Sequence, residues 1–275
     1  MDPFSAVALL YDLRLGGDRV IDRCVRVGTV LSLAHNKVRS SRKLEIMILE
    51  RTGGFAGLLC AATYIFGFVF LITTLAPLGF GTQAIDVEAV VSFIQDRPGF
   101  LILWNSVIYI LNALALAVLL AALYRRLGAK TPNLALVSLV LGIVWAVLVI
   151  GAGMIANVAV ERVALIAPDD MERAVVLWET LHAVELGLGG GNEIAGGVWI
   201  GCISLAALFG RSLGKITIGL GLLTSAGGLL TLIPALGDTA GVVFGLGAIV
   251  WFIAVGISLL FGPSADVAQP TSAKN

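Results

Sequence analysis

The segment "ETLHAVE" (179–185) is the one stretch of this sequence with the spacing of metal ligands. Glu179, His182 and Glu185 stand at i, i+3 and i+6, so a helix would place them along one side. Glu-x-x-His motifs on helices build di-iron carboxylate sites, but those sites need a second such motif from another helix. The only other histidine is His35, far away in the chain. We therefore expect the solvated face of a helix here, with a metal site as the weaker alternative.

A second group of polar residues centres on "GLGGGNEIAGGVW" (187–199), where a carboxylate and an amide stand among six glycines. Asn105, Tyr109 and Asn112 follow at i, i+4 and i+7 in another apolar segment, which gives one polar stripe on one helix face. The sequence predicts an outward-facing polar pocket for a small molecule or an ion. Its candidate residues are Glu193, Asn192, Asn105, Tyr109, Asn112 and Asn157.

Two other interpretations of these polar residues stay open. Glu193 lies near one end of its apolar segment and could reach the water among the lipid headgroups. The stripe at Asn105, Tyr109 and Asn112 could equally join helices through hydrogen bonds, each worth about 0.6 kcal/mol on average.

The glycines around Glu193 predict a close crossing of two helices. Gly197 and Gly201 form a GxxxG motif, and Gly190 and Ser204 keep the same face almost free of side-chain bulk. Small residues let a neighbouring backbone approach, which is how helices gain packing energy in lipid. Partner surfaces are offered by "GLGLLTSAGG" (219–228) and "GGFAG" (53–57).

The composition requires a membrane to position these residues. The 275-residue chain is 58% hydrophobic and 13% charged, and its mean hydropathy is +0.98, whereas a soluble domain carries about 25% charged residues. Its net charge is zero and it has no basic patch, so we expect no nucleic-acid partner. The three cysteines are isolated from one another, which predicts neither a disulfide framework nor a zinc cluster, and no motif calls for a cofactor.

We predict an all-α fold, a polytopic membrane bundle of about six transmembrane helices. Each apolar segment is long enough to cross a hydrocarbon core of about 30 Å as a helix. The leucine- and alanine-rich content favours helices over barrel strands. The predicted spans are 53–75, 100–123, 133–157, 187–210, 214–235 and 241–262.

The charges between these segments alternate in sign. Lysine and arginine gather at 39–51, 125–130 and 211–215, and carboxylates dominate 86–96 and 161–185. The positive-inside rule assigns the basic segments to the cytoplasm, so both termini should be cytoplasmic. The lipid bilayer is the partner that follows directly from this pattern, in a bacterial cytoplasmic (inner) membrane crossed several times.

The sequence divides into a tail at 1–50, a six-helix transmembrane domain at 51–262 and a cytoplasmic C-terminal tail at 263–275. The first of these mixes apolar residues with arginines and lacks the order of a secretory signal. Three interpretations stay open for it: a mobile cytoplasmic tail, a helix lying on anionic lipid, or a natural start at Met47.

The segments "GGGNEIAGGVWIGCISLAAL" (189–208), "GKITIGLGLLTSAGGLLTLIPAL" (214–236) and "FGLGAIVWFIAVGISLL" (244–260) resemble a family of bacterial multi-span membrane proteins classed as domain of unknown function 4386. The similarity covers about 45–262 and is most specific at Gly190 to Trp199. This resemblance implies a bacterial inner-membrane protein and carries no activity, substrate or cofactor with it.

The function expected from these patterns is non-enzymatic. We expect an integral membrane protein that acts as a transporter-like or sensing protein, with its polar pocket around Glu193. The alternatives are a scaffold or accessory protein without a ligand, and a metal-dependent membrane enzyme using Glu179, His182 and Glu185. A homo-oligomer is compatible with the sequence.

Overall fold

A computed structural model describes residues 3–80, 85–190 and 193–262, with side chains from Asn36 onward apart from positions 190, 234 and 238. The chain divides into two compact units, 1–47 and 48–275. In the first unit, residues 3–47 are helical and belong to α1 (Pro3–Phe70). Its side chains from Asn36 to Leu44 are exposed. The candidate site is built within the second unit.

The described residues contain helices and turns and no strand, which confirms the predicted all-α class. Short π-helical turns interrupt the longer helices at three places, and two 3-10 turns follow apolar helices. After α1 the elements are η1 (Leu71–Leu75), η2 (Ala76–Leu78), α2 (Val87–Asp96), α3 (Pro98–Asn105), η3 (Ser106–Leu111), α4 (Asn112–Gly128), α5 (Pro132–Ile166), α6 (Met171–Glu185), η4 (Leu186–Gly190), α7 (Ile194–Gly210), α8 (Lys215–Leu230), η5 (Pro234–Leu236) and α9 (Gly237–Phe261).

Local sequence signals explain where several helices begin. Proline opens α3 and α5, because its missing N–H is one that a first helical turn leaves unused. The Asp86 carboxylate accepts a hydrogen bond from the Ala89 N–H at 3.0 Å, and Asp170 accepts one from Arg173 at 3.0 Å. These caps fix the starts of α2 and α6, the two helices that flank the candidate site.

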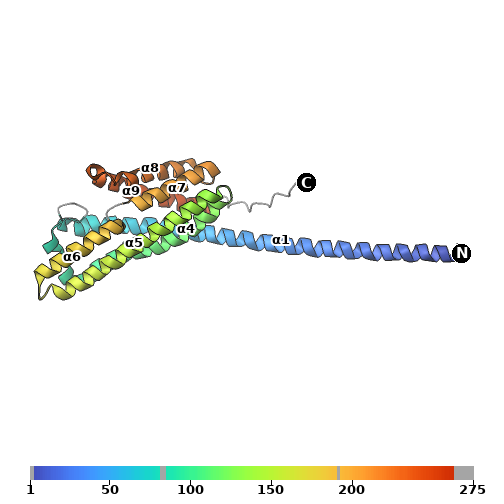
Figure 1. Cartoon of the computed structure of the whole chain (residues 1–275), viewed down its shortest axis with the longest axis horizontal. Coiled ribbons are helices and arrows are strands. Elements are labelled where there is room, and N and C mark those ends of the chain that lie inside the picture. The colour runs from blue at the N-terminus through green and yellow to red at the C-terminus, as the bar shows by residue number, and fades with distance from the viewer. Residues whose placement is uncertain (1–2, 81–84, 191–192, 263–275) are drawn as a thin grey trace. The chain divides into compact units, whose positions relative to one another are not determined.

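The helices of the second unit pack side by side in two groups joined by α5 (Figure 1). In one group α5 contacts α4 and α6, and in the other α8 contacts both α7 and α9. Contacts between α5 and α7 connect the groups.

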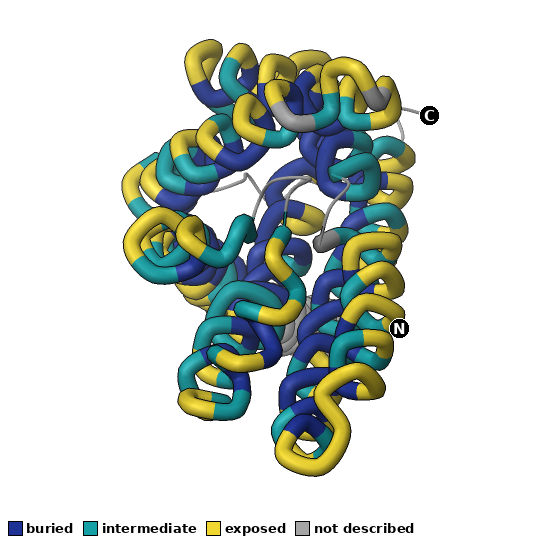
Figure 2. Tube along the Cα trace, turned by 90° about the vertical axis from the view of Figure 1, so that its left-hand side faces the viewer, coloured by how far each residue is buried: buried dark blue, intermediate teal, exposed yellow. Residues whose placement is uncertain are grey.

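The faces of α5 carry the signature of a lipid-facing helix. Its buried positions hold small residues such as Ala135, Gly142 and Ala152. Its outward positions hold large aliphatic ones, including Val140 and Val147, which are 54% and 60% exposed. Exposed and buried positions alternate along each helix with helical spacing (Figure 2). Water would penalise such an outer face, whereas lipid tails solvate it, so the helices suit a bilayer.

Five helical runs are long and apolar enough to cross a membrane: Asn36–Leu78, Pro98–Gly128, Pro132–Ile166, Met171–Gly210 and Thr239–Phe261. These overlap five of the six predicted spans. The segment predicted at 214–235 is different, because its helix α8 has 16 residues and is about 24 Å long. Turn residues after Leu230 and the 3-10 turn that begins at Pro234 end this helix early. The six-span count therefore stays a prediction.

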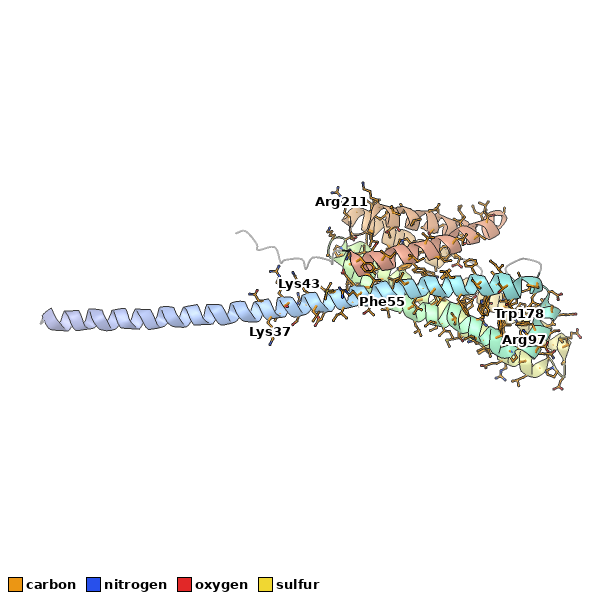
Figure 3. The ribbon with its side chains drawn as sticks, turned by 180° about the vertical axis from the view of Figure 1, so that it is seen from behind. Lys37, Lys43, Phe55, Arg97, Trp178 and Arg211 are labelled. Carbon is orange, nitrogen blue, oxygen red and sulfur yellow. The ribbon has the colours of Figure 1, made fainter. Side chains whose placement is uncertain are left out.

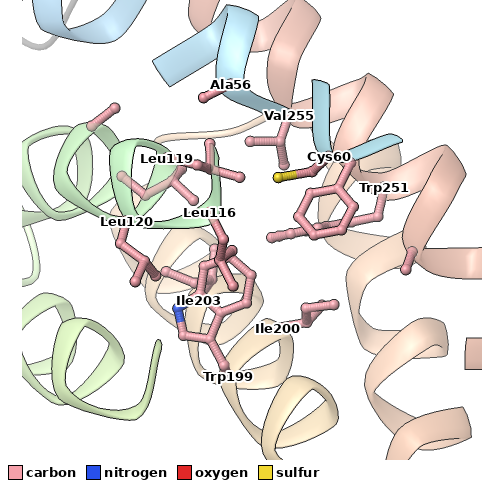
Figure 4. Close-up of a cluster of buried hydrophobic side chains, with 14 of the residues drawn as sticks. Ala56, Cys60, Leu116, Leu119, Leu120, Trp199, Ile200, Ile203, Trp251 and Val255 are labelled. Atoms are coloured by element: carbon pink, nitrogen blue, oxygen red, sulfur yellow. The ribbon is translucent and has the colours of Figure 1, made fainter. Parts of the chain in front are cut away.

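A dry aromatic core holds the two groups of helices together. Trp199 on α7 meets Trp251 on α9 edge to face at 5.4 Å, and Trp145 on α5 packs beside Trp199 at 5.4 Å. Leu116 and Leu119 of α4 and Cys60 of α1 complete this core (Figure 4). A second apolar cluster, around Val91, Ile94 and Trp178, holds α2 and α6 against α5.

Candidate functional site

The apolar run Met171–Gly210 is broken between α6 and α7, at the place where the sequence predicts an unbroken helix from 187. The π-helical turn η4 follows α6, and Gly189 within it has a φ of 131°. A side chain would strain the backbone in that conformation, so a glycine is required at this position. Helix α7 begins only at Ile194. We call residues 186–190 the break; Asn192, a predicted pocket residue, lies outside the described residues.

Glu193 occupies the N-cap of α7 and is not one of its helical residues, which corrects the predicted helical span that begins at 187. Its backbone N–H donates to Thr231 Oγ1 at 3.3 Å, and its carbonyl accepts from the Gly197 N–H at 2.8 Å. The side chain is half-buried, and no hydrogen bond or ion pair reaches its carboxylate from any described residue. The side chain lies within electrostatic range of the phenol groups of Tyr64 and Tyr109.

Glu185, the last residue of α6, is buried and makes the strongest polar contacts beside the break. Its Oε1 accepts a hydrogen bond from the Tyr109 hydroxyl at 2.5 Å, and its Oε2 lies 2.7 Å from His182 Nδ1. The Glu185 side chain is 9% exposed and that of His182 is 20% exposed, whereas Glu179 is exposed. The solvated face predicted for all three residues is therefore wrong for Glu185, because Tyr109 and His182 satisfy its carboxylate inside the bundle.

We call Tyr64, Tyr109, His182, Glu185 and Glu193 the polar cluster. It draws on α1, η3, α6 and the start of α7, so segments far apart in the sequence meet there. Two of its five residues, Tyr109 and Glu193, were predicted pocket residues. Tyr64 was missed because it stands alone in an apolar segment with no polar neighbour at helical spacing.

Among the other predicted pocket residues, Asn112 and Asn157 each form a hydrogen bond to a different segment. Asn112 donates to Thr63 Oγ1 on α1 at 2.6 Å and to the Cys60 carbonyl at 3.4 Å. Asn157 on α5 donates to Ser106 Oγ at 3.1 Å. Asn105 is also buried. The stripe therefore makes hydrogen bonds between helices, as its second interpretation requires, while a pocket around Glu193 stays a prediction.

The glycine face of α7 lies against α8 at very short range. A Cβ added to Gly197 would stand 3.0 Å from the Cα of Gly228, and one on Gly201 would stand 2.5 Å from Ser225 Oγ. Ser204 fills the space left by Gly221. This is the close crossing with 219–228 that the spacing predicts. Gly190, the fourth predicted packing residue, lies in η4 instead.

The other glycine motif, at 53–57, meets a different partner from α7. A Cβ on Gly54 would stand 2.9 Å from the Gly256 carbonyl oxygen, and one on Gly57 would stand 3.3 Å from the Gly256 Cα. Helix α1 therefore crosses α9 at this point. The motif predicts a close approach correctly, but spacing alone does not say which helix approaches.

A buried ion pair joins four segments at the other end of the bundle. Arg126 Nη1 lies 3.2 Å from Glu50 Oε1, and the two side chains are 7% and 2% exposed. Arg126 Nε donates to the Ser212 carbonyl at 3.3 Å, and a Cβ on Gly262 would stand 3.2 Å from its Nη2. Trp178 and Arg97 lie at one end of the bundle and Arg211 at the opposite end (Figure 3).

Metal ligands do not gather among the described residues, where no group of three or more His, Cys, Asp and Glu side chains is placed to hold an ion. Glu179 points to the surface, and His182 and Glu185 bond to each other. The chemistry that the polar cluster offers is that of two carboxylates, two phenols and one imidazole.

The chain matches no protein-family model, no curated protein and no solved structure.

Proposed function

We propose that this protein is a transporter-like or sensing protein of a bacterial cytoplasmic membrane, which binds a small molecule or an ion at the polar cluster. The observation that carries the proposal is the break in an apolar run of 40 residues, with Glu185 before it and Glu193 after it. Irregular backbone at membrane depth is tolerated only where protein buries it or where it lines a polar cavity. Transporters place their binding sites at such interrupted helices.

The state of Glu193 supports a ligand-binding role. A charged carboxylate at the centre of a bilayer costs about 2.5–3.5 kcal/mol on insertion scales, and ionisable residues within spans usually mark a functional site. Glu185 is satisfied by Tyr109 and His182, whereas the Glu193 carboxylate has no hydrogen-bonding partner among the described residues. A ligand that pairs with this carboxylate would offset the cost of holding it among apolar helices.

The proposal includes six spans with both termini in the cytoplasm. The contacts of Arg126 support this topology, because they bring together Glu50, Ser212 and Gly262 from three segments that the positive-inside rule places on one side. The aromatic rings of Phe80, Trp104 and Trp178 gather at the other end of the bundle. Such rings favour the interface between membrane and water.

Ligand-dependent stabilisation tests the proposal. Purified protein in detergent is screened for thermal stability against monovalent ions, amino acids, amines and small carboxylates. A binder at 100 times its Kd stabilises the folded state by about 2.7 kcal/mol. We expect at least one compound to raise the Tm of the wild type, Glu193→Gln to lose this effect, and Glu179→Gln to keep it because Glu179 is exposed.

Two results would overturn the proposal. The first is a screen in which no compound stabilises the wild-type protein. The second is a Glu193→Gln variant that responds to every compound as the wild type does.

A scaffold without a ligand is the second candidate function. The bonds from Asn112 to Thr63 and from Asn157 to Ser106 favour it, because they use polar residues to join helices and leave those amide donors engaged. A scaffold would show no ligand-dependent shift in Tm and would depend on its glycine crossings alone.

A further inference from the structure

The His182 ring packs against two aromatic rings, which also contact each other, and is partly exposed. It stacks on Trp178 with ring centroids 4.4 Å apart and planes inclined by 23°, and the Phe80 ring lies 6.1 Å away. The side chain is 20% exposed, so it is not sealed inside the bundle. Histidine is the side chain whose charge ordinarily changes between about pH 5 and pH 8.

The hydrogen bonds of this ring lead directly into the bundle. An ionised carboxylate can only accept, so His182 Nδ1–H donates to Glu185 Oε2 at 2.7 Å. The Tyr109 hydroxyl donates to Glu185 Oε1 at 2.5 Å. His182, Glu185 and Tyr109 thus form a chain from a partly exposed ring on α6 to a phenol on η3. The Glu193 side chain lies within electrostatic range of that same phenol.

Other charged groups on the helices around His182 are exposed. The neighbouring helices α2 and α5 and helix α6 itself carry charged side chains that are all exposed, and no ion pair joins any of them to His182 within the described part of the chain. These are Glu88, Asp96, Glu161, Arg162, Glu172, Arg173 and Glu179. Glu185 is therefore the charged group in contact with the imidazole.

We propose that His182, Glu185 and Tyr109 form a proton-binding site that changes the charge beside Glu193 by one unit. In the deprotonated state the imidazole is neutral, the Glu185 carboxylate is negative and the tyrosine keeps its proton. A proton from water then bonds to the free electron pair of Nε2, while Nδ1–H stays bonded to Glu185. The product is an imidazolium–carboxylate pair without net charge, and the positive ring lies over the face of Trp178.

The link to ligand binding rests on the proposed function. Glu185 is the last residue of α6 and Glu193 is the N-cap of α7, so neutralising the first carboxylate changes the electrostatic field at the second. By linkage, a ligand bound at Glu193 and a proton bound at His182 must alter each other's affinity. The proton site itself depends only on the contacts of His182.

Tryptophan fluorescence and histidine NMR of the full chain test the proton site. An imidazolium stacked on an indole quenches its emission, so the emission of the wild type should fall as the pH is lowered from about 8 to about 5. We expect His182→Gln and Trp178→Phe each to remove this titration, and His35→Gln, the matched control, to keep it. In labelled His35→Gln protein, the one remaining histidine ring should titrate over the same range.

Each outcome bears on one of the two proposals. An unchanged titration in His182→Gln, or a histidine signal in His35→Gln that does not titrate in this range, would overturn the proton site. The NMR measurement leaves His182 in place, so it decides the question even where His182→Gln does not fold. A ligand screen without hits beside an intact titration would overturn the ligand-binding function alone. A ligand affinity that depends on pH in the wild type and not in His182→Gln would support both.

Discussion

The crossing of α7 and α8 and the polar cluster hold helices together by opposite means. At the crossing, Gly197 faces Gly228 and Gly201 faces Ser225, so the backbones themselves are in contact. In the cluster, Tyr109 and His182 reach the Glu185 carboxylate through long side chains. The first region has regular helices. The second lies where two π-helical turns, η3 and η4, interrupt them.

The difference shows what each kind of contact requires from the chain. Close packing in lipid needs only small residues at a helical period, and it stabilises through dispersion contacts without polar atoms. A carboxylate inside the bundle needs donors at fixed positions, and irregular turns let helices present them. The crossing is therefore suited to stability. The cluster holds groups that can change charge, which is what a ligand site needs.

The largest loss of stability is expected from a substitution that breaks the crossing of α7 and α8. Gly228→Leu places a side chain where even a Cβ would stand 2.7 Å from the Gly197 Cα, so the two backbones must separate. Extra methylenes in a packed core cost about 1–3 kcal/mol, and here a whole leucine side chain must displace backbone, so we expect a larger loss of stability than for any variant below. We expect little folded monomer by size-exclusion chromatography and a greatly lowered Tm.

Gly219→Leu on the same helix is the matched control. Gly219 is exposed, and a Cβ there would meet no heavy atom within 4 Å. We expect its stability to stay within about 0.5 kcal/mol of wild type. A Gly228→Leu protein with wild-type Tm and yield would show that the α7–α8 contact does not hold the bundle together.

The crossing could be predicted from sequence, because its determinants are local. Gly197, Gly201 and Ser204 recur at a helical period, and 219–228 offered the matching surface one helix later. Five of the spans follow from hydropathy for the same reason, since each depends on its own composition. The extent of α8 was overestimated because hydropathy continues past Leu230, where the helix ends.

The cluster could be predicted only in part, because its determinants are distant from one another. Hydropathy runs through the break without a signal, and the φ of Gly189 reflects how α6 and α7 are placed by their neighbours. Glu185 has the sequence pattern of a surface residue, and the Tyr109 hydroxyl that satisfies it lies 76 positions earlier in the chain. A pairing between residues so far apart cannot be predicted from a single sequence.

An intermediate effect is expected from the ion pair at the opposite end of the bundle. Arg126→Met removes the guanidinium that contacts Glu50 and the Ser212 carbonyl. Breaking a buried ion pair costs roughly 3–5 kcal/mol, and here the helices still have their glycine crossings to hold them. We expect a folded protein with a clearly lowered Tm, whereas Arg125→Met, on the exposed neighbour, changes stability by no more than about 0.5 kcal/mol. Equal Tm values for the two variants would show that the Arg126–Glu50 ion pair does not contribute to the stability of the protein.

The smallest expected effects are the coupling energies of two hydrogen bonds, one between α4 and α1 and one in the polar cluster. Two double-mutant cycles measure them. One pairs Asn112→Ala with Thr63→Ala, which removes a neutral hydrogen bond of 2.6 Å between α4 and α1. The other pairs Tyr109→Phe with Glu185→Gln, which removes the phenol–carboxylate bond of the polar cluster. Hydrogen bonds between membrane helices contribute about 0.6 kcal/mol on average, and charge-assisted ones are roughly twice as strong.

We therefore expect coupling energies of about 0.6 kcal/mol for the first pair and about 1.2 kcal/mol for the second, measured by unfolding in detergent. The second coupling should also depend on pH, because protonation of His182 gives the Glu185 carboxylate a positive partner that competes with Tyr109. The first pair contains no group that titrates near neutral pH, so its coupling should be the same at about pH 5 and about pH 8. A Tyr109–Glu185 coupling that is small and independent of pH would show that the polar cluster, like the glycine crossing, only holds helices together. The proposed difference between a stabilising region and a region that changes charge would then be wrong.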